Sequence, residues 1–177
     1  MGSSECGVPT WTRHRPPPTR RRLADWLLLA VGRIGTSPEA ALVARYAARL
    51  RPALRIVEVA DGRGAPGEIM RREAEALRGR IPADALSIAL DRGGDAPDSA
   101  GLARLLTRWT EAGRPLCFLI GGAEGLDPSL LDRADARLSL GPMVWPHLLA
   151  RAMLAEQLFR AQSILANHPY HRGPRGP

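Results

Sequence analysis

The sequence predicts an α/β domain whose sheet is mainly parallel. Short apolar runs typical of strands alternate with amphipathic stretches typical of helices. Glycine or proline separates consecutive segments, for example at Gly32 and Gly113. The run at 115–120 is almost wholly apolar, as expected for a strand that is buried on both faces of a parallel sheet. Together these features favour one domain built from repeated strand–helix units.

The expected elements follow one another in a regular order. Apolar or alternating runs predict five strands, at 26–31, 54–59, 85–90, 115–120 and 137–140. Helices are expected at 37–50, 68–77 and 99–112, over a short stretch from 127, and at 146–166. Ser37 and Asp127, each followed by proline, are typical N-caps because their side chains accept hydrogen bonds from free amides of the first helical turn.

Two helices have apolar patterns that predict which faces are buried. In the first, Leu42, Tyr46 and Leu50 recur at helical spacing and predict a buried stripe. In the last, apolar residues occupy much of the circumference, which indicates burial against more than one surface, such as the sheet and a partner subunit. Its two apolar sides are formed by Leu148, Ala152, Ala155 and Phe159, and by Leu154, Leu158, Ala161 and Leu165.

The positive charge is concentrated at the ends of the chain. The net charge is +7, and all 25 basic residues are arginines. Residues 1–22 combine arginines with a proline triplet, so we expect a disordered extension, either an artefact of the assigned start or an RNA-binding arm. We expect the folded domain at 23–172 and a flexible tail at 173–177. Because the domain itself is almost neutral, net charge alone is weak support for nucleic acid binding.

Several kinds of protein and site are disfavoured by the sequence. No apolar run approaches the length of a membrane span and the start does not fit a signal peptide, so we expect no membrane association and a cytoplasmic location. Cys6 and Cys117 make no disulfide framework, and no metal ligands cluster, so no metal site is expected. Cys117 lies in an apolar run and is interpreted as a small buried hydrophobe.

Glycines follow three of the predicted strands. They are Gly93 and Gly94, Gly121 and Gly122, and Gly141. Carboxyl ends of parallel strands meet at one edge of a sheet, where open α/β domains bind ligands, and glycine lets a ligand approach the main chain. The pattern predicts one cofactor pocket, although a tight turn alone would also explain the pair at 121–122.

No catalytic triad, metal cluster or pair of carboxylates emerges with usable spacing. Asp91 and Glu156 are the candidate acid–base carboxylates, and His147 opens the last helix. The absence of a nucleophile fits a reaction in which a cofactor supplies the electrophile. The segment at 168–172 reads His-Pro-Tyr-His-Arg, and its aromatic and arginine side chains suit base stacking and phosphate binding, as an alternative to a frayed end.

Four motifs resemble a known family. They are FLIGGAEG at 118–125, PHLLAR at 146–151, EQLFRA at 156–161 and NHPYHR at 167–172. In this order they are similar to the RlmH family of SPOUT-class ribosomal RNA pseudouridine methyltransferases, and the resemblance runs from about residue 27 to 172. It implies a SPOUT fold with a five- to six-stranded sheet and a C-terminal trefoil knot, in a homodimer whose sites are completed by the partner.

The resemblance also implies a cofactor, S-adenosyl-L-methionine, held largely through main-chain groups. The expected cofactor-binding residues are Leu90, Gly122, Gly141, Pro142, Met143, Val144, Trp145 and Pro146. The family commonly carries serine and threonine in the loop after residue 140, whereas this loop reads Gly-Pro-Met-Val-Trp. Contacts of side chains with the cofactor are therefore less expected here than contacts of the main chain.

The implied activity is methylation of N3 of pseudouridine 1915 in helix 69 of 23S rRNA, on the assembled 70S ribosome. Removal of the N3 proton needs a base, for which the candidates are His147, Glu156 and His171. The residues expected to bind RNA are Arg151, Arg160, Tyr170 and Arg172. Three alternatives stay open: a SPOUT enzyme acting on tRNA, an inactive homologue that binds ribosomes, and a generic nucleotide-binding domain.

Overall fold

The computed structural model describes residues 26–170, in which strands and helices alternate as expected. The expected extension at 1–22, the tail at 173–177 and the candidates His171 and Arg172 lie outside the described residues. The elements are β1 (Trp26–Val31), α1 (Pro38–Ala47), β2 (Leu54–Val59), α2 (Pro66–Arg78), β3 (Leu86–Asp95), α3 (Ser99–Glu111), β4 (Leu116–Ile120), α4 (Pro128–Leu131), β5 (Ala136–Leu138) and α5 (His147–Leu165).

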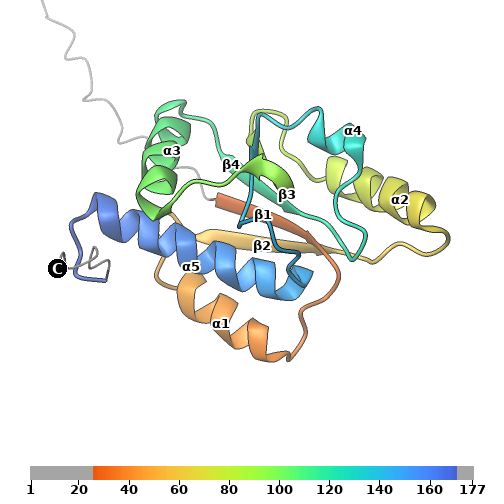
Figure 1. Ribbon diagram of the computed structural model, residues 1–177, viewed down its shortest axis with the longest axis horizontal. Coiled ribbons are helices and arrows are strands. Elements are labelled where there is room, and N and C mark those ends of the chain that lie inside the picture. Colours follow the sequence, from red (N-terminus) through yellow and green to blue (C-terminus); the bar gives the residue numbers. More distant parts are fainter. Residues whose placement is uncertain (1–25, 171–177) are drawn as a thin grey trace, which may run out of the picture.

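The five strands form one sheet in the order β2-β1-β4-β3-β5, and every neighbouring pair is parallel. The prediction of an α/β domain with a parallel sheet is confirmed (Figure 1). All residues of β1 and β4 are buried, which agrees with their continuous apolar sequences. Parallel strands place all their carboxyl ends at one edge, and the candidate site lies there.

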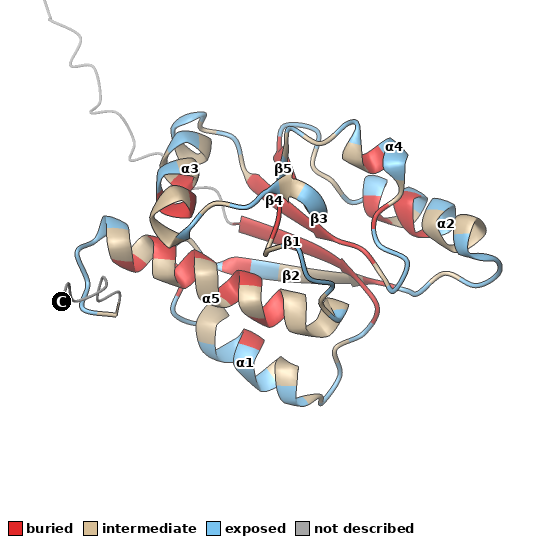
Figure 2. Ribbon diagram, in the orientation of Figure 1, coloured by how far each residue is buried: buried red, intermediate tan, exposed pale blue. Residues whose placement is uncertain are grey.

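Alternate residues of the strands feed two cores, one on each face of the sheet. Leu28 and Ala30 of β1 face the core under α1, α3 and α5, whereas Leu27 and Leu29 face the core under α2 and α4. Figure 2 shows buried residues concentrated on the central strands and on the inner faces of the helices. Cys117 is fully buried in the second core, as predicted.

The predicted helix starts are confirmed by their capping bonds. Ser37 Oγ accepts from the Ala40 amide at 3.3 Å, and Asp127 Oδ1 accepts from the Ser129 amide at 2.8 Å. Proline occupies the first turn in both helices, where it sacrifices no hydrogen bond. These local signals set the helix starts independently of tertiary packing.

The predicted buried stripe of α1 is partly wrong. Leu42 is 41% exposed, while its neighbour Val43 is 3% exposed and Leu50 is fully buried. The helix packs against α5, and this partner turns the face of Val43 and Tyr46 inward. The position of α5 therefore decides which of two adjacent apolar residues is buried.

Strand β3 extends five residues beyond the prediction. Its pairing with β5 is irregular, because Leu90 and Asp95 both lie opposite Leu138. A Cβ on Gly94 would lie 2.7 Å from the carbonyl carbon of Arg137, so only glycine allows this close approach of the two strands. The irregularity puts residues 90–92 at the mouth of the candidate site.

Most of the apolar surface of α5 is buried within one chain, although Leu165 is 51% exposed and Leu148 is only partly buried. The helix lies on the sheet between α1 and α3, and Leu154, Leu158 and Ala161 are fully buried there. The expectation that a partner subunit covers one side is therefore not needed to explain these residues.

In the described part of the chain, no helix is both long and apolar enough to cross a membrane.

Candidate functional site

A cavity of about 360 Å³ lies at the carboxyl ends of β3, β4 and β5. Three segments line it: residues 90–92 within the second half of β3, residues 120–126 at the end of β4 and after it, and the loop leading to α5. Six of the eight expected cofactor residues are among its lining, namely Leu90, Gly122, Gly141, Met143, Val144 and Trp145. Pro142 and Pro146 belong to the same loop but do not line the cavity.

The glycine pair after β4 makes both a turn and a wall of the cavity. The Gly125 amide donates to the Gly122 carbonyl at 3.1 Å, and Gly125 has a positive φ of 84°. Residues 122 and 125 therefore close a tight turn, and residues 121–125 line the cavity. The glycines at 121–122 therefore belong to a tight turn and also line the cavity, so the two interpretations made from the sequence are compatible.

Space at Gly122 is limited by a buried carboxylate. A Cβ on Gly122 would lie 2.9 Å from Oε2 of Glu73, which is only 4% exposed. Oε1 of Glu73 accepts from the Gly62 amide at 2.9 Å, whereas Oε2 has no partner among the described residues. The Glu73 side chain thus lies against the turn on the α2 side of the sheet and leaves no room for a larger residue at 122.

The loop between β5 and α5 is held by its own hydrogen bonds. The hydroxyl of Ser139 bonds to the Gly141 carbonyl at 3.0 Å, and the indole of Trp145 donates to the Leu140 carbonyl at 3.3 Å. Met143 and Val144 are 63% and 79% exposed. The loop therefore offers main-chain and apolar surface to a ligand, in line with its unusual sequence.

Two of the expected acid–base residues, His147 and Asp91, lie at the cavity, and Oδ2 of Asp91 accepts from the Gly93 amide at 2.7 Å. His147 comes from the last helix. It is half-buried at the first position of α5 and forms part of the lining. Its Nε2 and Oδ1 of Asp61 lie 3.2 and 2.8 Å from where a Cβ on Gly32 would be. Gly32, with a φ of 86°, leaves the room in which these two side chains approach.

Arg151 is not placed to bind RNA, so that expectation is wrong. Its side chain is fully buried and pairs with Glu58 at 2.8 Å. It also donates to the carbonyl oxygens of Val31 and Gly32. Burial lowers the pKa of Arg151, while the Glu58 carboxylate acts in the opposite direction. Arg151 therefore joins α5 to β1 and β2 beside the cavity.

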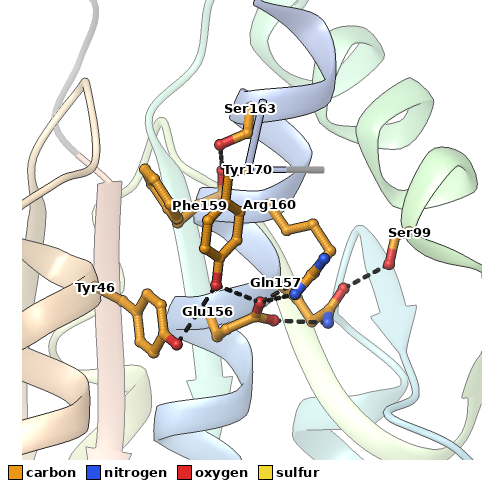
Figure 3. A network of polar contacts seen from close by, with 8 residues as sticks. All are labelled: Tyr46, Ser99, Glu156, Gln157, Phe159, Arg160, Ser163 and Tyr170. Carbon is orange, nitrogen blue, oxygen red and sulfur yellow. Dashed lines mark hydrogen bonds and ion pairs between the residues drawn. The ribbon is translucent and has the colours of Figure 1, made fainter. Parts of the chain in front are cut away.

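The other expected residues gather towards the opposite end of α5 (Figure 3). Arg160 donates to Oε1 of Glu156 at 3.0 and 2.5 Å, and the hydroxyl of Tyr170 donates to the same oxygen at 3.0 Å. The hydrogen bond to Glu156 raises the pKa of Arg160. Desolvation, aided by the hydroxyl of Tyr46 and by Glu156, raises the pKa of Tyr170. In this polar cluster, Arg160 and Tyr170 are therefore both hydrogen-bonded to the Glu156 carboxylate.

His147 and Glu156 do not meet within one chain. They are nine residues apart on one straight helix, which separates them by about 13 Å along its axis. The structure therefore brings His147 to the cavity and collects Glu156, Arg160 and Tyr170 elsewhere. A single protomer offers a cofactor cavity and a separate polar cluster.

Sequence reasoning missed Glu73, Glu58 and Ser139. Glu73 had a detectable signal, because it stands four residues before the buried Leu77 on the apolar face of α2. Glu58 carries no such signal, since its partner Arg151 is distant in sequence. The hydroxyl of Ser139 bonds within its own loop, to Gly141, but its amide pairs with the distant Asp95 carbonyl. In residues 26–170, no group of three or more histidine, cysteine or acidic side chains could hold a metal ion.

Comparisons with known proteins agree with this arrangement. Residues 25–171 match the family described as "Predicted SPOUT methyltransferase". A protein of Acidiphilium cryptum named "Ribosomal RNA large subunit methyltransferase H" is 60% identical over 84% of this chain and 94% of its own. A protein of the same name from Gluconacetobacter diazotrophicus is 58% identical over 84% and 97%.

A solved structure also shares the fold. It is that of a probable methylase family protein from Haemophilus influenzae, with a TM-score of 0.52 at 11% identity, over 85% of this chain and 72% of the other. At this identity the likeness concerns the fold alone. The family match and the high identities go further, and by them the chain belongs to the SPOUT methyltransferases, in the family of ribosomal RNA large subunit methyltransferase H.

Proposed function

We propose that the protein transfers a methyl group from S-adenosylmethionine to large-subunit ribosomal RNA. The relatives at 60% and 58% identity are named for a methyltransferase of this RNA. The observation of the structure that carries the proposal is the cavity at the carboxyl ends of β3, β4 and β5. Ligands of open α/β sheets bind at this edge.

The residues around the cavity fit such a cofactor. A volume of about 360 Å³ lies within the range of small-molecule sites, roughly 300–1,000 Å³. Its walls combine apolar side chains such as Leu90 and Leu126 with main chain at Gly122 and Gly141. These residues, with 143–145, would hold the cofactor. The cofactor supplies a methyl group on a positively charged sulfur, so the chain needs no nucleophile of its own.

His147 is our candidate for the base that takes the proton from N3 of the acceptor. Both His147 and the other expected candidate Asp91 line the cavity, and we favour His147 because histidine as a residue type exchanges protons near neutral pH. Asp61 also lies close to Gly32, on the same side as the imidazole. Holding the acceptor in line with the methyl group contributes the larger part of the acceleration, roughly 7–11 kcal/mol in favourable cases.

A second copy of the chain completes the site in this proposal. Glu156, Arg160 and Tyr170 form a polar cluster about 13 Å along α5 from His147, too far to act on the same acceptor atom in one chain. In a homodimer, the cluster of one protomer can face the cavity of the other. The trefoil knot implied by the resemblance is part of the same proposal.

The finer substrate that we propose is N3 of pseudouridine 1915 in helix 69 of 23S rRNA, in the assembled 70S ribosome. It follows from the resemblance of the four sequence motifs. Arg160 and Tyr170 would bind the RNA together with Arg172, while His171 stays a candidate base; Arg172 and His171 lie outside the described residues. A ribosomal substrate would place the reaction in the cytoplasm.

The test is methyl transfer from labelled S-adenosylmethionine to ribosomes that lack this modification, with free 23S rRNA alongside. We expect label in helix 69, on assembled ribosomes in preference to free RNA. Label at another position of the rRNA would keep the methyltransferase and reject the finer substrate. Cofactor binding without transfer to either RNA would overturn the proposal.

A further inference from the structure

Tyr170, the last described residue, is folded back onto α5 (Figure 3). Its ring stands edge-on to Phe159, with centroids 4.7 Å apart, and its hydroxyl donates to Glu156 at 3.0 Å. The His168 amide donates to the Ser163 carbonyl at 2.8 Å, which turns the chain back at the end of the helix. The segment after α5, residues 166–170, therefore packs in a defined position on its own protomer.

Arg49, just beyond α1, packs against the rings of Phe159 and Tyr170. Its guanidinium carbon lies 4.2 Å from the ring centroid of Phe159 and 5.6 Å from that of Tyr170. The side chain is exposed and, among residues 26–170, forms no ion pair. Its charge therefore interacts in the fold mainly with the faces of the two rings.

Arg49 and Arg160 hold the tyrosine by different means. Arg160 lies 5.0 Å from the Tyr170 ring and is neutralised by Glu156 at 2.5 Å. Arg49 forms no ion pair among the described residues and reaches Tyr170 from the turn that follows α1. It thus links the position of Tyr170 to α1 as well as to α5.

We propose that Arg49 is a positioning residue that holds the C-terminal segment in place through Tyr170. The proposal rests on the proposed function, in which Tyr170 and the residues after it bind RNA. Fixing Tyr170 fixes the point from which the next two residues start. An exposed arginine without an acidic partner then contributes to RNA binding through the tyrosine that it holds.

The first experiment is a double-mutant cycle on methyl transfer to ribosomes. Arg49→Met keeps the apolar stem and removes the charge, and should raise KM for the RNA about two- to fivefold, the factor for an exposed cation–π contact, with kcat within about twofold. Arg49→Lys, which retains a cation, should recover most of the loss. Arg45→Met is the matched control, because Arg45 lies over Tyr46 alone, at 5.9 Å.

The cycle separates positioning from direct contact. If Arg49 acts through Tyr170, adding Arg49→Met to Tyr170→Ala changes KM no further. Additive effects would mean that Arg49 touches the RNA itself, and would overturn the proposal. An effect of Arg45→Met equal to that of Arg49→Met would also overturn it, since general surface charge would then be the cause.

The second experiment does not depend on activity. Amide hydrogen exchange at 167–170 should be about two- to fivefold faster in Arg49→Met than in the unchanged protein, while exchange in the middle of α5 stays the same. Unchanged exchange at 167–170 would overturn the positioning role. If the protein transferred no methyl group, the proposed function would fail, and this measurement would still decide whether Arg49 holds the segment.

Discussion

Arg151 of α5 and Glu58 of β2 form an ion pair of 2.8 Å across 93 residues of sequence. The arginine is fully buried, while the side chain of Glu58 is 28% exposed. Glu58 also accepts from the Ile34 amide at 2.8 Å, so one carboxylate oxygen links α5 to the loop after β1. The pair fixes the start of α5, where His147 stands, against the sheet.

Arg151→Met should lower the free energy of unfolding by about 3–5 kcal/mol, because it breaks a buried pair and leaves the Val31 and Gly32 carbonyls without their donor. Urea denaturation measures this loss. The control is Arg160→Met, since Arg160 is 29% exposed and its ion pair contributes about 1 kcal/mol or less. A stable Arg151→Met protein with weakened RNA binding would restore the role that the sequence suggested for Arg151.

Gly122→Ala should impair both the fold and cofactor binding. The new Cβ would lie 2.9 Å from Oε2 of Glu73 and 3.1 Å from Val31 Cγ1, so the turn at 122–125 must shift. Such overpacking costs about 1–3 kcal/mol, and the cavity wall moves with the turn. Thermal unfolding and calorimetric titration with S-adenosylmethionine measure the two effects.

Two further variants make the Gly122 prediction specific. Gly67→Ala is the control, because a Cβ there meets only the end of Arg71 at 3.8 Å, and it should leave cofactor affinity unchanged. Glu73→Ala removes the clashing carboxylate, so the double variant Gly122→Ala/Glu73→Ala should lose less than the sum of the two single changes. Strict additivity would show that Glu73 does not limit the space at residue 122.

The sequence predicted those parts of the fold that local signals determine. The apolar run of β4 and the caps at Ser37 and Asp127 were predicted within one residue of the observed elements. The extension of β3 to Asp95 was not, because residues 93–94 are glycines and the strand continues only by pairing with β5. Leu42 was wrongly placed in the core, because only the packing of α5 selects Val43 in its stead.

The candidate site, like the fold, could be predicted only where local sequence signals determine it. The glycines after β4 and β5 line the cavity, as expected because parallel strands end at a common edge, whereas Gly93 and Gly94 lie within β3 and do not line it. The burial of Arg151 was not predictable, since its acceptors are contributed by residues 93 to 120 positions away. The knot and the homodimer stay predictions of the resemblance.

Stability should fall in alkali because of Cys117. Burial raises the pKa of this thiol from its ordinary value of 9.0 to about 12. A raised folded pKa contributes stability below the unfolded pKa, and this contribution is lost as the pH rises from about 9 to 12. Between pH 7 and 10.5 the unchanged protein should lose about 2 kcal/mol more of its unfolding free energy than Cys117→Ala. Equal losses in the two proteins would exclude Cys117 as the cause.

Mixed dimers test whether each site uses two chains. His147→Ala and Arg160→Ala should each be nearly inactive, because one lacks the residue at the cavity and the other disrupts the cluster around Glu156. When the two variants are unfolded and refolded together, half of the dimers carry both chains. Each mixed dimer then has one intact composite site, so about a quarter of the normal activity should return. If His147 and Arg160 acted together in a site formed by a single chain, every site would carry one of the two substitutions and no activity would return.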